Sequence, residues 1–382
     1  MNAYNCVVLA YGSHSENYLN IPGEKSFDNL ISAKDFVSWY NGLPDSENLR
    51  VNLNCKKAII IGAGNVAIDI ARILLSPVEK LEKTDITAKS IELIKTTNKI
   101  EQISIVARRG ILNAAFTIKE LRELTKIESI DCRIDLKHFQ DIARISNKLS
   151  RPRKRLTEFM FNIANKPINT NSNKILELVF LKTPLEIIGE LDSKNDRPTV
   201  TGVKFKNNKY DFDFTRTDVK LDSEDALNAL PVVEDSQQQV ETISTDLVVR
   251  SIGFKNINID KDIPFDKKTG TIPNENGKVI GKDGLYCTGW IKRGPRGVIV
   301  DTTTDANETA KKIAFDLKNS ETSLKEGTNQ IVEILKNRNV RFVDKQGWSR
   351  IDKEEIKRGK LIGKPREKFQ KIEEMLKVAL ND

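Results

Sequence analysis

The chain has 382 residues, of which 38% are hydrophobic and 30% are charged, and its formal net charge is +8. This composition is typical of a globular protein of about two to three domains, and no apolar run reaches the about 18 residues of a membrane-spanning helix. The positive net charge predicts an acidic partner, substrate or surface, and the basic residues are scattered among 54 acidic ones, so we expect no dedicated nucleic-acid surface. The cysteines form no CxxC motif, which argues for a reducing compartment and against a bound metal.

The N-terminal region predicts a short strand and a helix. A buried strand over 6–10 ends at Gly12, and a helix over 32–40 has Ser32 as its N-cap. Gly42 and Pro44 end this helix.

A strand–turn–helix over 59–72 is the most informative segment. The apolar run that ends at Ile61 leads into Gly62, which permits a tight turn, and Gly64, which allows backbone N–H groups to approach a pyrophosphate. Ala67 lets the helix pack closely on the strand, and the helix N-terminus offers its positive end to phosphate. The segment predicts a dinucleotide-binding βαβ unit; a plain tight turn is the alternative.

The next predicted strand, 102–107, ends in Arg108 and Arg109. An NAD site usually has a carboxylate at this point to accept from the ribose 2′-hydroxyl. Two guanidinium groups instead offer planar hydrogen bonds to a 2′-phosphate, which indicates NADP. A solvated basic turn is the alternative. The interval from Gly64 exceeds the usual spacing of about 20 residues because a polar, helical excursion over 77–99 intervenes.

The rest of the chain predicts alternating helices and strands. Thr117 is the N-cap of a helix to Leu124, with Glu120 at the capping-box position. The basic cluster from Arg151 to Arg155 precedes a helix over 156–164, and Pro152 argues against regular helix within the cluster. The further expectations are an antiparallel meander over 175–220, a poorly ordered loop over 223–242, strands over 245–253 and 284–290, a helix over 297–318 and a broken helical tail over 331–380.

These segments, in this order, resemble the adrenodoxin reductase family, the mitochondrial-type ferredoxin–NADP reductases. The similarity spans nearly all of the chain. It is carried by Gly62–Ala67, Ala71–Leu75, Thr84–Ile86, Arg108–Gly110, Ala115–Arg122, Arg151–Glu158, Gly289–Pro295, Gly359 and Gly363–Lys368.

The resemblance implies an FAD enzyme that takes hydride from NADPH and passes single electrons to a small acidic [2Fe–2S] ferredoxin. It implies that Arg151 and Arg155 dock the ferredoxin. It places Trp290, Gly297, Val298 and Ile299 at the flavin. It assigns NADP to Gly62, Gly64, Asn65, Val66, Ala67, Arg108, Arg109, Glu120 and Gly297.

Each assignment has a structural alternative. Trp290 suits an apolar core, and 297–299 suits a plain helix start after a Gly-Pro turn. Arg151 and Arg155 suit a solvated turn, and Glu120 suits a capping box alone. Hydride transfer needs stacked rings more than an acid or base, so no general base is assigned.

Asp305, which follows the flavin-proximal segment, is a candidate for proton movement. No metal site is expected.

The predicted fold class is α/β with two Rossmann-like, doubly wound domains. We expect a complete NADP domain over 18–250. The FAD domain is expected to be truncated at its N-terminus, with a remnant over 1–17 and its C-terminal part over 251–382, because the GxGxxG unit that relatives carry first is absent. The resemblance implies a monomer at the mitochondrial matrix or the matrix face of the inner membrane, although 1–4 shows no transit peptide.

The leading function is NADPH:ferredoxin oxidoreduction that serves iron–sulfur cluster assembly or ferredoxin-dependent haem- or steroid-type pathways. A non-catalytic NADP-binding protein, or an incomplete gene model of the reductase, is the alternative. A flavoprotein disulfide reductase is disfavoured because no CxxC exists, and a nucleic-acid role rests on net charge alone.

Overall fold

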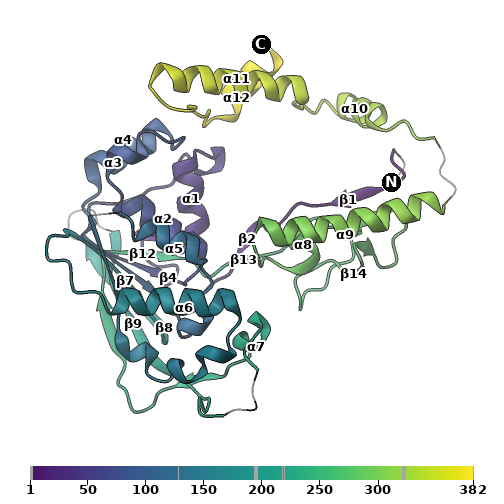
Figure 1. The fold of residues 1–382 in the computed structure, drawn as a ribbon. Coiled ribbons are helices and arrows are strands. Elements are labelled where there is room, and N and C mark those ends of the chain that lie inside the picture. The colour runs from purple at the N-terminus through teal and green to yellow at the C-terminus, as the bar shows by residue number, and fades with distance from the viewer. Residues whose placement is uncertain are drawn as a thin grey trace. The chain divides into compact units, whose positions relative to one another are not determined.

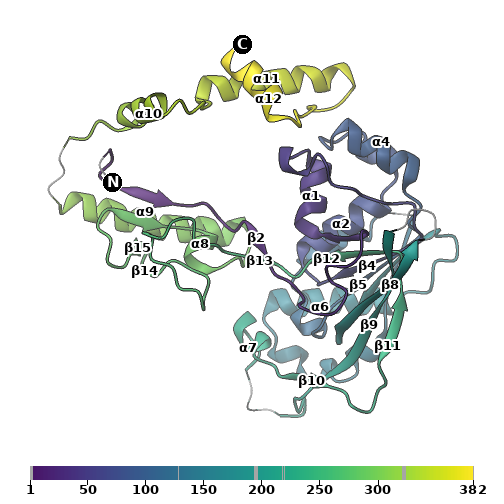
Figure 2. The same ribbon diagram turned by 180° about the vertical axis from the view of Figure 1, so that it is seen from behind.

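The structure is a computed structural model that describes residues 3–127, 129–192, 197–216, 218, 220–320 and 324–381. It divides into two compact units: unit 1 comprises Met1–Tyr18 and Gly253–Asp344, and unit 2 comprises Leu19–Ile252 and Lys345–Asp382. Figures 1 and 2 show both units from opposite sides. Within the described ranges, no helix combines the length and apolar character that a membrane crossing requires.

A parallel sheet of six strands forms the centre of unit 2. Its strands lie in the order β3 (Leu30–Ser32), β12 (Leu247–Arg250), β4 (Lys57–Ile61), β5 (Gln102–Val106), β7 (Lys174–Val179) and β6 (Ile130–Ile134). Every neighbouring pair is parallel. Four of the five residues of β4 are buried, as a parallel strand covered on both faces requires. The α/β class predicted from the sequence is confirmed.

Helices cover one face of this sheet, and an antiparallel sheet covers the other (Figures 1 and 2). On the second face, Ile59, Ile61 and Val248 of the parallel strands pack with Val203 and Phe205. The helices are α1 (Ala33–Asn41), α2 (Asn65–Leu75), α3 (Val78–Leu81), α4 (Ala88–Thr97), α5 (Ile118–Leu124) and α6 (Arg151–Ala164). The antiparallel strands are β8 (Lys182–Asp192), β9 (Arg197–Tyr210), β10 (Val232–Glu234) and β11 (Glu241–Ser244).

Short-range signals in the sequence set the helix ends. Ser32 accepts a hydrogen bond from the Asp35 backbone, and Gly42 ends α1 in the left-handed conformation. Thr117 caps α5 by accepting from the Glu120 backbone N–H.

The excursion over 77–99 holds α3 and α4. Short 3₁₀ turns occupy Pro44–Ser46 (η1), Ile111–Asn113 (η2), Leu136–Phe139 (η3) and Ile142–Lys148 (η4).

Three local predictions are wrong. β7 is a parallel strand of the central sheet, not part of a meander. The segment 223–242 holds α7 (Glu224–Asn228), β10 and the start of β11, because pairing with β9 orders it. α6 begins at Arg151 with Pro152 in its first turn, where the missing N–H of proline has no helical partner to lose.

Unit 1 has a mixed sheet and one long helix. β1 (Val7–Leu9) pairs in parallel with β16 (Leu285–Cys287), which continues antiparallel to β15 (Lys278–Val279) and β14 (Asn274–Glu275). β2 (Ser15–Glu16) pairs with β13 (Phe254–Lys255). The helices of unit 1 are α8 (Trp290–Arg293), α9 (Ile299–Lys318) and α10 (Thr328–Asn337).

The C-terminal helices α11 (Lys345–Leu361) and α12 (Ile372–Leu380) belong to unit 2, whereas the sequence grouped 251–382 together. The connection between them reaches the excursion after α3. Lys364 donates to the Ile86 carbonyl, Glu367 Oε1 accepts from the Ala88 N–H at 2.9 Å, and Lys368 Nζ lies 3.0 Å from Asp85 Oδ2. Two segments of the resemblance, 84–86 and 363–368, therefore meet in space.

Candidate functional site

The turn after β4 requires glycine at its first position. Gly62 has φ +115°, and a Cβ there would lie 2.0 Å from the Ser251 carbonyl oxygen. The Gly62 N–H donates to the Val106 carbonyl at 2.8 Å. The turn therefore lies directly against the end of β12 and is tied to the end of β5.

The second glycine leaves open space at the start of α2. A Cβ at Gly64 would meet no heavy atom within 4 Å, and no side chain caps the helix. Ala67 and Ile68 donate to the Gly64 carbonyl, so the backbone N–H groups of Asn65 and Val66 have no helical acceptor. Ala67 is fully buried. The result is an uncovered, positively polarised helix end of the kind that binds phosphate.

The predicted arginine pair follows β5 directly. The half-buried Arg109 donates from Nη1 to the side-chain oxygen of Asn228 at 2.6 Å. The Arg108 carbonyl accepts from the Asn208 amide at 2.8 Å, which fixes the backbone. The Arg108 side chain is exposed. The pair therefore sits at the carboxyl end of β5, beside the turn that Gly62 anchors through Val106.

A loop links the glycine turn to α5. The Ala115 N–H donates to the Ala63 carbonyl at 2.9 Å, and the Thr117 N–H donates to Asn65 Oδ1 at 2.8 Å. The Asn65 side chain is therefore used within unit 2 to hold the N-cap of α5. Glu120 lies half-buried in the first turn of α5, with its N–H 3.4 Å from Thr117 Oγ1.

The N-terminus of α6 carries the predicted docking cations. Arg151 and Arg155 are exposed and lie four residues apart, so one helical turn separates them on one face. Arg153 between them is buried: it donates to the Ala114 carbonyl at 2.7 Å and to both Glu224 carboxylate oxygens at 3.2 and 2.6 Å. The first turn holds no acidic residue, so its cations add to the positive end of the helix dipole.

Asp305 anchors α9 to the turn after β16. The carboxylate accepts from the Gly289 N–H at 2.6 Å and the Thr288 hydroxyl at 2.9 Å, and it lies 2.9 Å from Lys292 Nζ. Burial raises the pKa of this carboxyl, but the hydrogen bonds and the lysine outweigh burial and lower the pKa below its usual value. This arrangement keeps Asp305 ionised and engaged, which suits a positioning role better than proton transfer.

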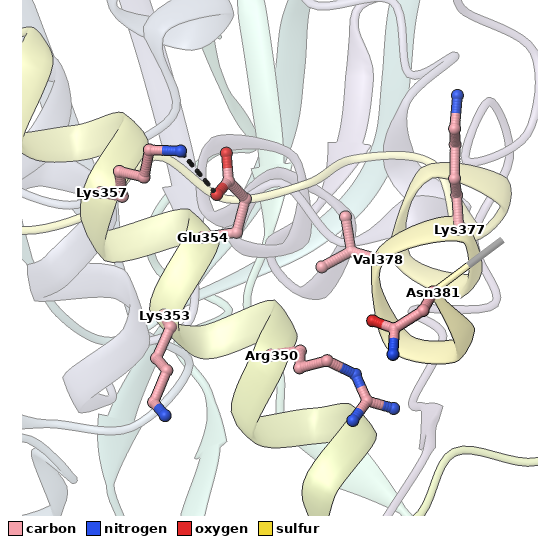
Figure 3. Close-up of a pocket in the computed structure, with 7 residues that line it drawn as sticks. All are labelled: Arg350, Lys353, Glu354, Lys357, Lys377, Val378 and Asn381. Atoms are coloured by element: carbon pink, nitrogen blue, oxygen red, sulfur yellow. Dashed lines mark hydrogen bonds and ion pairs between the residues drawn. The ribbon is translucent and has the colours of Figure 1, made fainter.

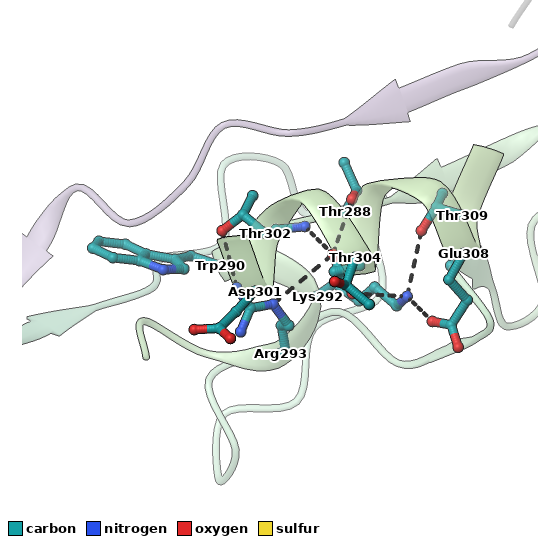
Figure 4. Close-up of polar contacts among 12 residues, drawn as sticks. Thr288, Trp290, Lys292, Arg293, Asp301, Thr302, Thr304, Glu308 and Thr309 are labelled. Atoms are coloured by element: carbon teal, nitrogen blue, oxygen red, sulfur yellow. Dashed lines mark hydrogen bonds and ion pairs between the residues drawn. The ribbon is translucent and has the colours of Figure 1, made fainter. Parts of the chain in front are cut away.

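The predicted flavin residues lie at the start of α8 and α9. The half-buried Trp290 ring packs on Phe254, with centroids 5.7 Å apart. Gly297 has φ +82°. The Val298 N–H donates to Asp301 Oδ2 at 2.7 Å, and Ile299 is 84% exposed. The Arg293 side chain joins α8 to α9 by donating to Thr302 Oγ1 at 3.0 Å. Figure 4 shows Trp290 beside the first turn of α9.

One surface hollow lies outside all the predicted site residues. It has a volume of about 360 Å³ between α11 and α12 (Figure 3). Four cations line it with one acid: Arg350, Lys353, Lys357, Lys377 and Glu354. Glu354 accepts from Lys357 at 3.4 Å, and Arg350 donates to the Ala379 carbonyl.

In the described ranges, no group of three or more His, Cys, Asp or Glu side chains is placed to hold a metal ion.

Sequence reasoning missed three residues that support this site. The sequence shows Arg153 only as part of a basic cluster and Asn228 only within a segment predicted to be a loop, and it does not distinguish Asn208 from other polar residues. Their contacts join residues 39, 119 and 100 positions apart, respectively. Such pairings leave no local pattern in a single sequence.

The fold and the site define a two-unit α/β protein whose unit 2 carries a dinucleotide-binding turn. No family model matches the chain. It is similar to the mitochondrial NADPH:adrenodoxin oxidoreductase of Salvelinus fontinalis, with 38% identity over 99% of this chain and 74% of the relative. The Homo sapiens protein of the same name is 37% identical over 98% of this chain and 74% of its own length.

A solved structure extends the likeness to the fold. Mycobacterium tuberculosis FprA in complex with NADPH matches with a TM-score of 0.85 and 31% identity, covering 99% of this chain and 79% of that one. The chain belongs to the adrenodoxin reductase family of oxidoreductases. The resemblance that the sequence motifs indicated is confirmed.

Proposed function

We propose that the chain is an FAD-dependent NADPH:ferredoxin oxidoreductase. The observation that carries the proposal is the open start of α2 behind Gly64, next to the arginine pair after β5. An uncovered helix N-terminus accommodates a pyrophosphate, and guanidinium groups at the end of the next strand suit a 2′-phosphate. Family membership adds the reaction class.

The nucleotide half of the proposal uses residues of unit 2. Asn65 and Val66 supply backbone N–H groups, and Gly64 leaves the space into which a phosphate fits. Arg108 and Arg109 recognise the 2′-phosphate. The Asn65 side chain already holds the α5 cap, so its share in binding is through the backbone.

The flavin half uses residues of unit 1. FAD supplies the hydride acceptor and the single-electron donor when it is bound. The residues present fit the ring end of that group: the start of α9 is exposed, and Trp290 lies beside it. The N–H groups of Ile299 and Val300 suit a developing negative charge, and Asp305 holds α9 in place through Gly289 and Lys292.

The acceptor protein is proposed to be an acidic [2Fe–2S] ferredoxin that docks on Arg151 and Arg155. Buried Arg153 fixes the first turn of α6 between them, so the two exposed cations are presented from a rigid base. The relatives are named mitochondrial, and we propose the same location for this protein, with electrons serving iron–sulfur cluster assembly or ferredoxin-dependent haem- or steroid-type pathways.

Binding titrations test the nucleotide half. Replacing Arg108 and Arg109 by alanine should weaken NADP(H) binding by about 1–3 kcal/mol for each lost charged contact and change NAD(H) binding little. Arg144→Ala, an exposed arginine elsewhere in unit 2, is the matched control. Equal losses for NADP(H) and NAD(H) would refute the 2′-phosphate assignment.

Electron-transfer assays test the docking half. Arg151→Ala and Arg155→Ala should slow reduction of an acidic ferredoxin, most at low ionic strength, and leave NADPH oxidation by a small dye unchanged. Lys353→Ala, which removes an exposed cation from α11, should affect neither assay. A parallel loss in both assays after the α6 substitutions would contradict the docking role.

A further inference from the structure

One member of the arginine pair is held by a side chain from a distant part of unit 2. Arg109 Nη1 donates to Asn228 Oδ1 at 2.6 Å across 119 residues of sequence. Asn228 is the last residue of α7 and is exposed. Arg108, its neighbour in the pair, has its backbone fixed by Asn208 rather than its guanidinium. The two arginines are therefore not equivalent.

α7 is held in place by contacts with the rest of unit 2. It has five residues, too few to be stable alone. Leu227 is fully buried, and its carbonyl accepts from the Asn113 amide at 2.7 Å. Glu224 receives two hydrogen bonds from the buried Arg153. These contacts make the end of α7 a fixed support for the amide of Asn228.

The chemistry of the support matters as much as its place. An amide oxygen orients a guanidinium without adding a negative charge beside it, whereas a carboxylate at this position would pair with the guanidinium and repel the phosphate. The amide also keeps an NH₂ group that can donate to a phosphate oxygen. Holding the long Arg109 side chain in advance lowers the conformational entropy lost on binding.

We propose that Asn228 is a positioning residue that sets the preference for a 2′-phosphorylated cofactor by orienting Arg109. The inference rests on the proposed function, because it assumes that Arg109 meets the 2′-phosphate. It assigns a specificity role to α7, a segment outside the glycine turn and the arginine pair.

The test compares binding of 2′,5′-ADP and 5′-AMP to the full chain by calorimetry, which requires no flavin. Asn228→Ala should weaken 2′,5′-ADP binding about threefold to tenfold, the range for one hydrogen bond, and leave 5′-AMP binding unchanged. Asn228→Asp should weaken 2′,5′-ADP binding about tenfold or more, because the new carboxylate pairs with Arg109. Asn171→Ala, an exposed asparagine of unit 2, should change neither affinity.

A larger loss for Asn228→Asp than for Asn228→Ala distinguishes charge competition from simple loss of structure. Unchanged 2′,5′-ADP affinity in both variants, or parallel losses for both ligands, would overturn the inference. Arg109→Ala separates this failure from failure of the proposed function. If Arg109→Ala abolishes the preference for 2′,5′-ADP while both Asn228 variants keep it, only the inference fails; if Arg109→Ala keeps the preference, the 2′-phosphate assignment fails as well.

Discussion

Unit 2 and unit 1 differ in what holds them together. Unit 2 buries two large apolar clusters, one against its helices and one against the antiparallel sheet. Unit 1 has a small cluster of Ile272, Val279, Cys287 and Ile291. Its longest helix, α9, buries Asp305 and Thr309 and exposes Phe315. Apolar burial therefore dominates the stability of unit 2, whereas polar contacts carry more of the stability of unit 1.

The difference matches the chemistry proposed for each unit. Unit 2 must present fixed backbone N–H groups and cations to a phosphate, and a rigid apolar core provides such a support. In unit 1, the network around Asp305 ties α9 to the turn that bears Trp290. The position of the proposed flavin site thus depends on a few charged and polar contacts.

The largest expected effect comes from a matched pair of phenylalanines. Phe205→Ala in unit 2 removes a fully buried ring and should lower the free energy of unfolding by about 3–5 kcal/mol. Phe315→Ala on α9 removes a ring that is 63% exposed and should cost no more than about 1 kcal/mol. Denaturant unfolding measures both free energies. A loss at Phe315 comparable to that at Phe205 would contradict the difference drawn between the two units, because it would show that the outer face of α9 is buried.

Removing the carboxylate at the centre of the unit 1 network should have the next largest effect. Asp305→Asn removes one of the two carboxylates that pair with Lys292 and leaves Glu308 as the other, so it should destabilise unit 1 by about 1.5–3 kcal/mol. Asp301→Asn weakens only an exposed contact to the Val298 N–H and should cost about 1 kcal/mol or less. Hydrogen exchange of the α9 amides distinguishes the two variants. Equal protection of α9 in both variants would contradict the anchoring role of Asp305.

Two glycines should separate binding from stability. Gly64→Ala enters open space, so the free energy of unfolding should change by less than about 1 kcal/mol, while the added methyl group should weaken NADP(H) binding. Gly297→Ala must adopt φ +82° and meets Asp301 at 2.4 Å, which should destabilise unit 1 by about 1–2 kcal/mol. Thermal unfolding measures the stability of both variants, and NADP(H) titration measures the loss of binding expected for Gly64→Ala.

The last comparison between the units is a difference in their response to acid. Burial lowers the pKa of His138 in unit 2 from 6.5 to about 4, so between these values the unfolded chain binds a proton that the folded chain does not, and acidification lowers the stability of unit 2. The lowered pKa of Asp305 contributes stability above 3.8 that is lost only as the pH falls through its folded value. His138→Gln should reduce the slope of the unfolding free energy of unit 2 against pH between pH 4 and 6.5. An unchanged slope would exclude His138 as the cause of this pH dependence.

Local signals in the sequence were enough to locate the glycine turn and the helix caps. Thr117 caps α5 through the Glu120 N–H three residues on, and the spacing of Gly62 and Gly64 between a strand and a helix is also local, so spacing alone reveals both. The contact that requires glycine at 62, with the Ser251 carbonyl, is distant in sequence. Pro152 misled the prediction because proline disrupts a helix interior but is favoured in the first turn, and the helix start was placed five residues late.

The other features of the fold and the site depend on contacts between residues far apart in the sequence. The partner of Arg109 lies in α7, and the contacts of 363–368 with 84–88 join residues 278 and 279 positions apart in the sequence. Composition and periodicity carry no information on such pairings. The family resemblance identifies 84–86 and 363–368 as motifs but does not relate them to each other. The structure shows that they are in contact.

The most direct test of the account is the visible absorption spectrum of the purified 382-residue chain after incubation with FAD, followed by anaerobic addition of NADPH or NADH. The account predicts a flavin band that NADPH bleaches at concentrations where NADH does not, because Arg108 and Arg109 favour the 2′-phosphate. A chain that shows no flavin band, or a band that both cofactors bleach equally, would contradict it.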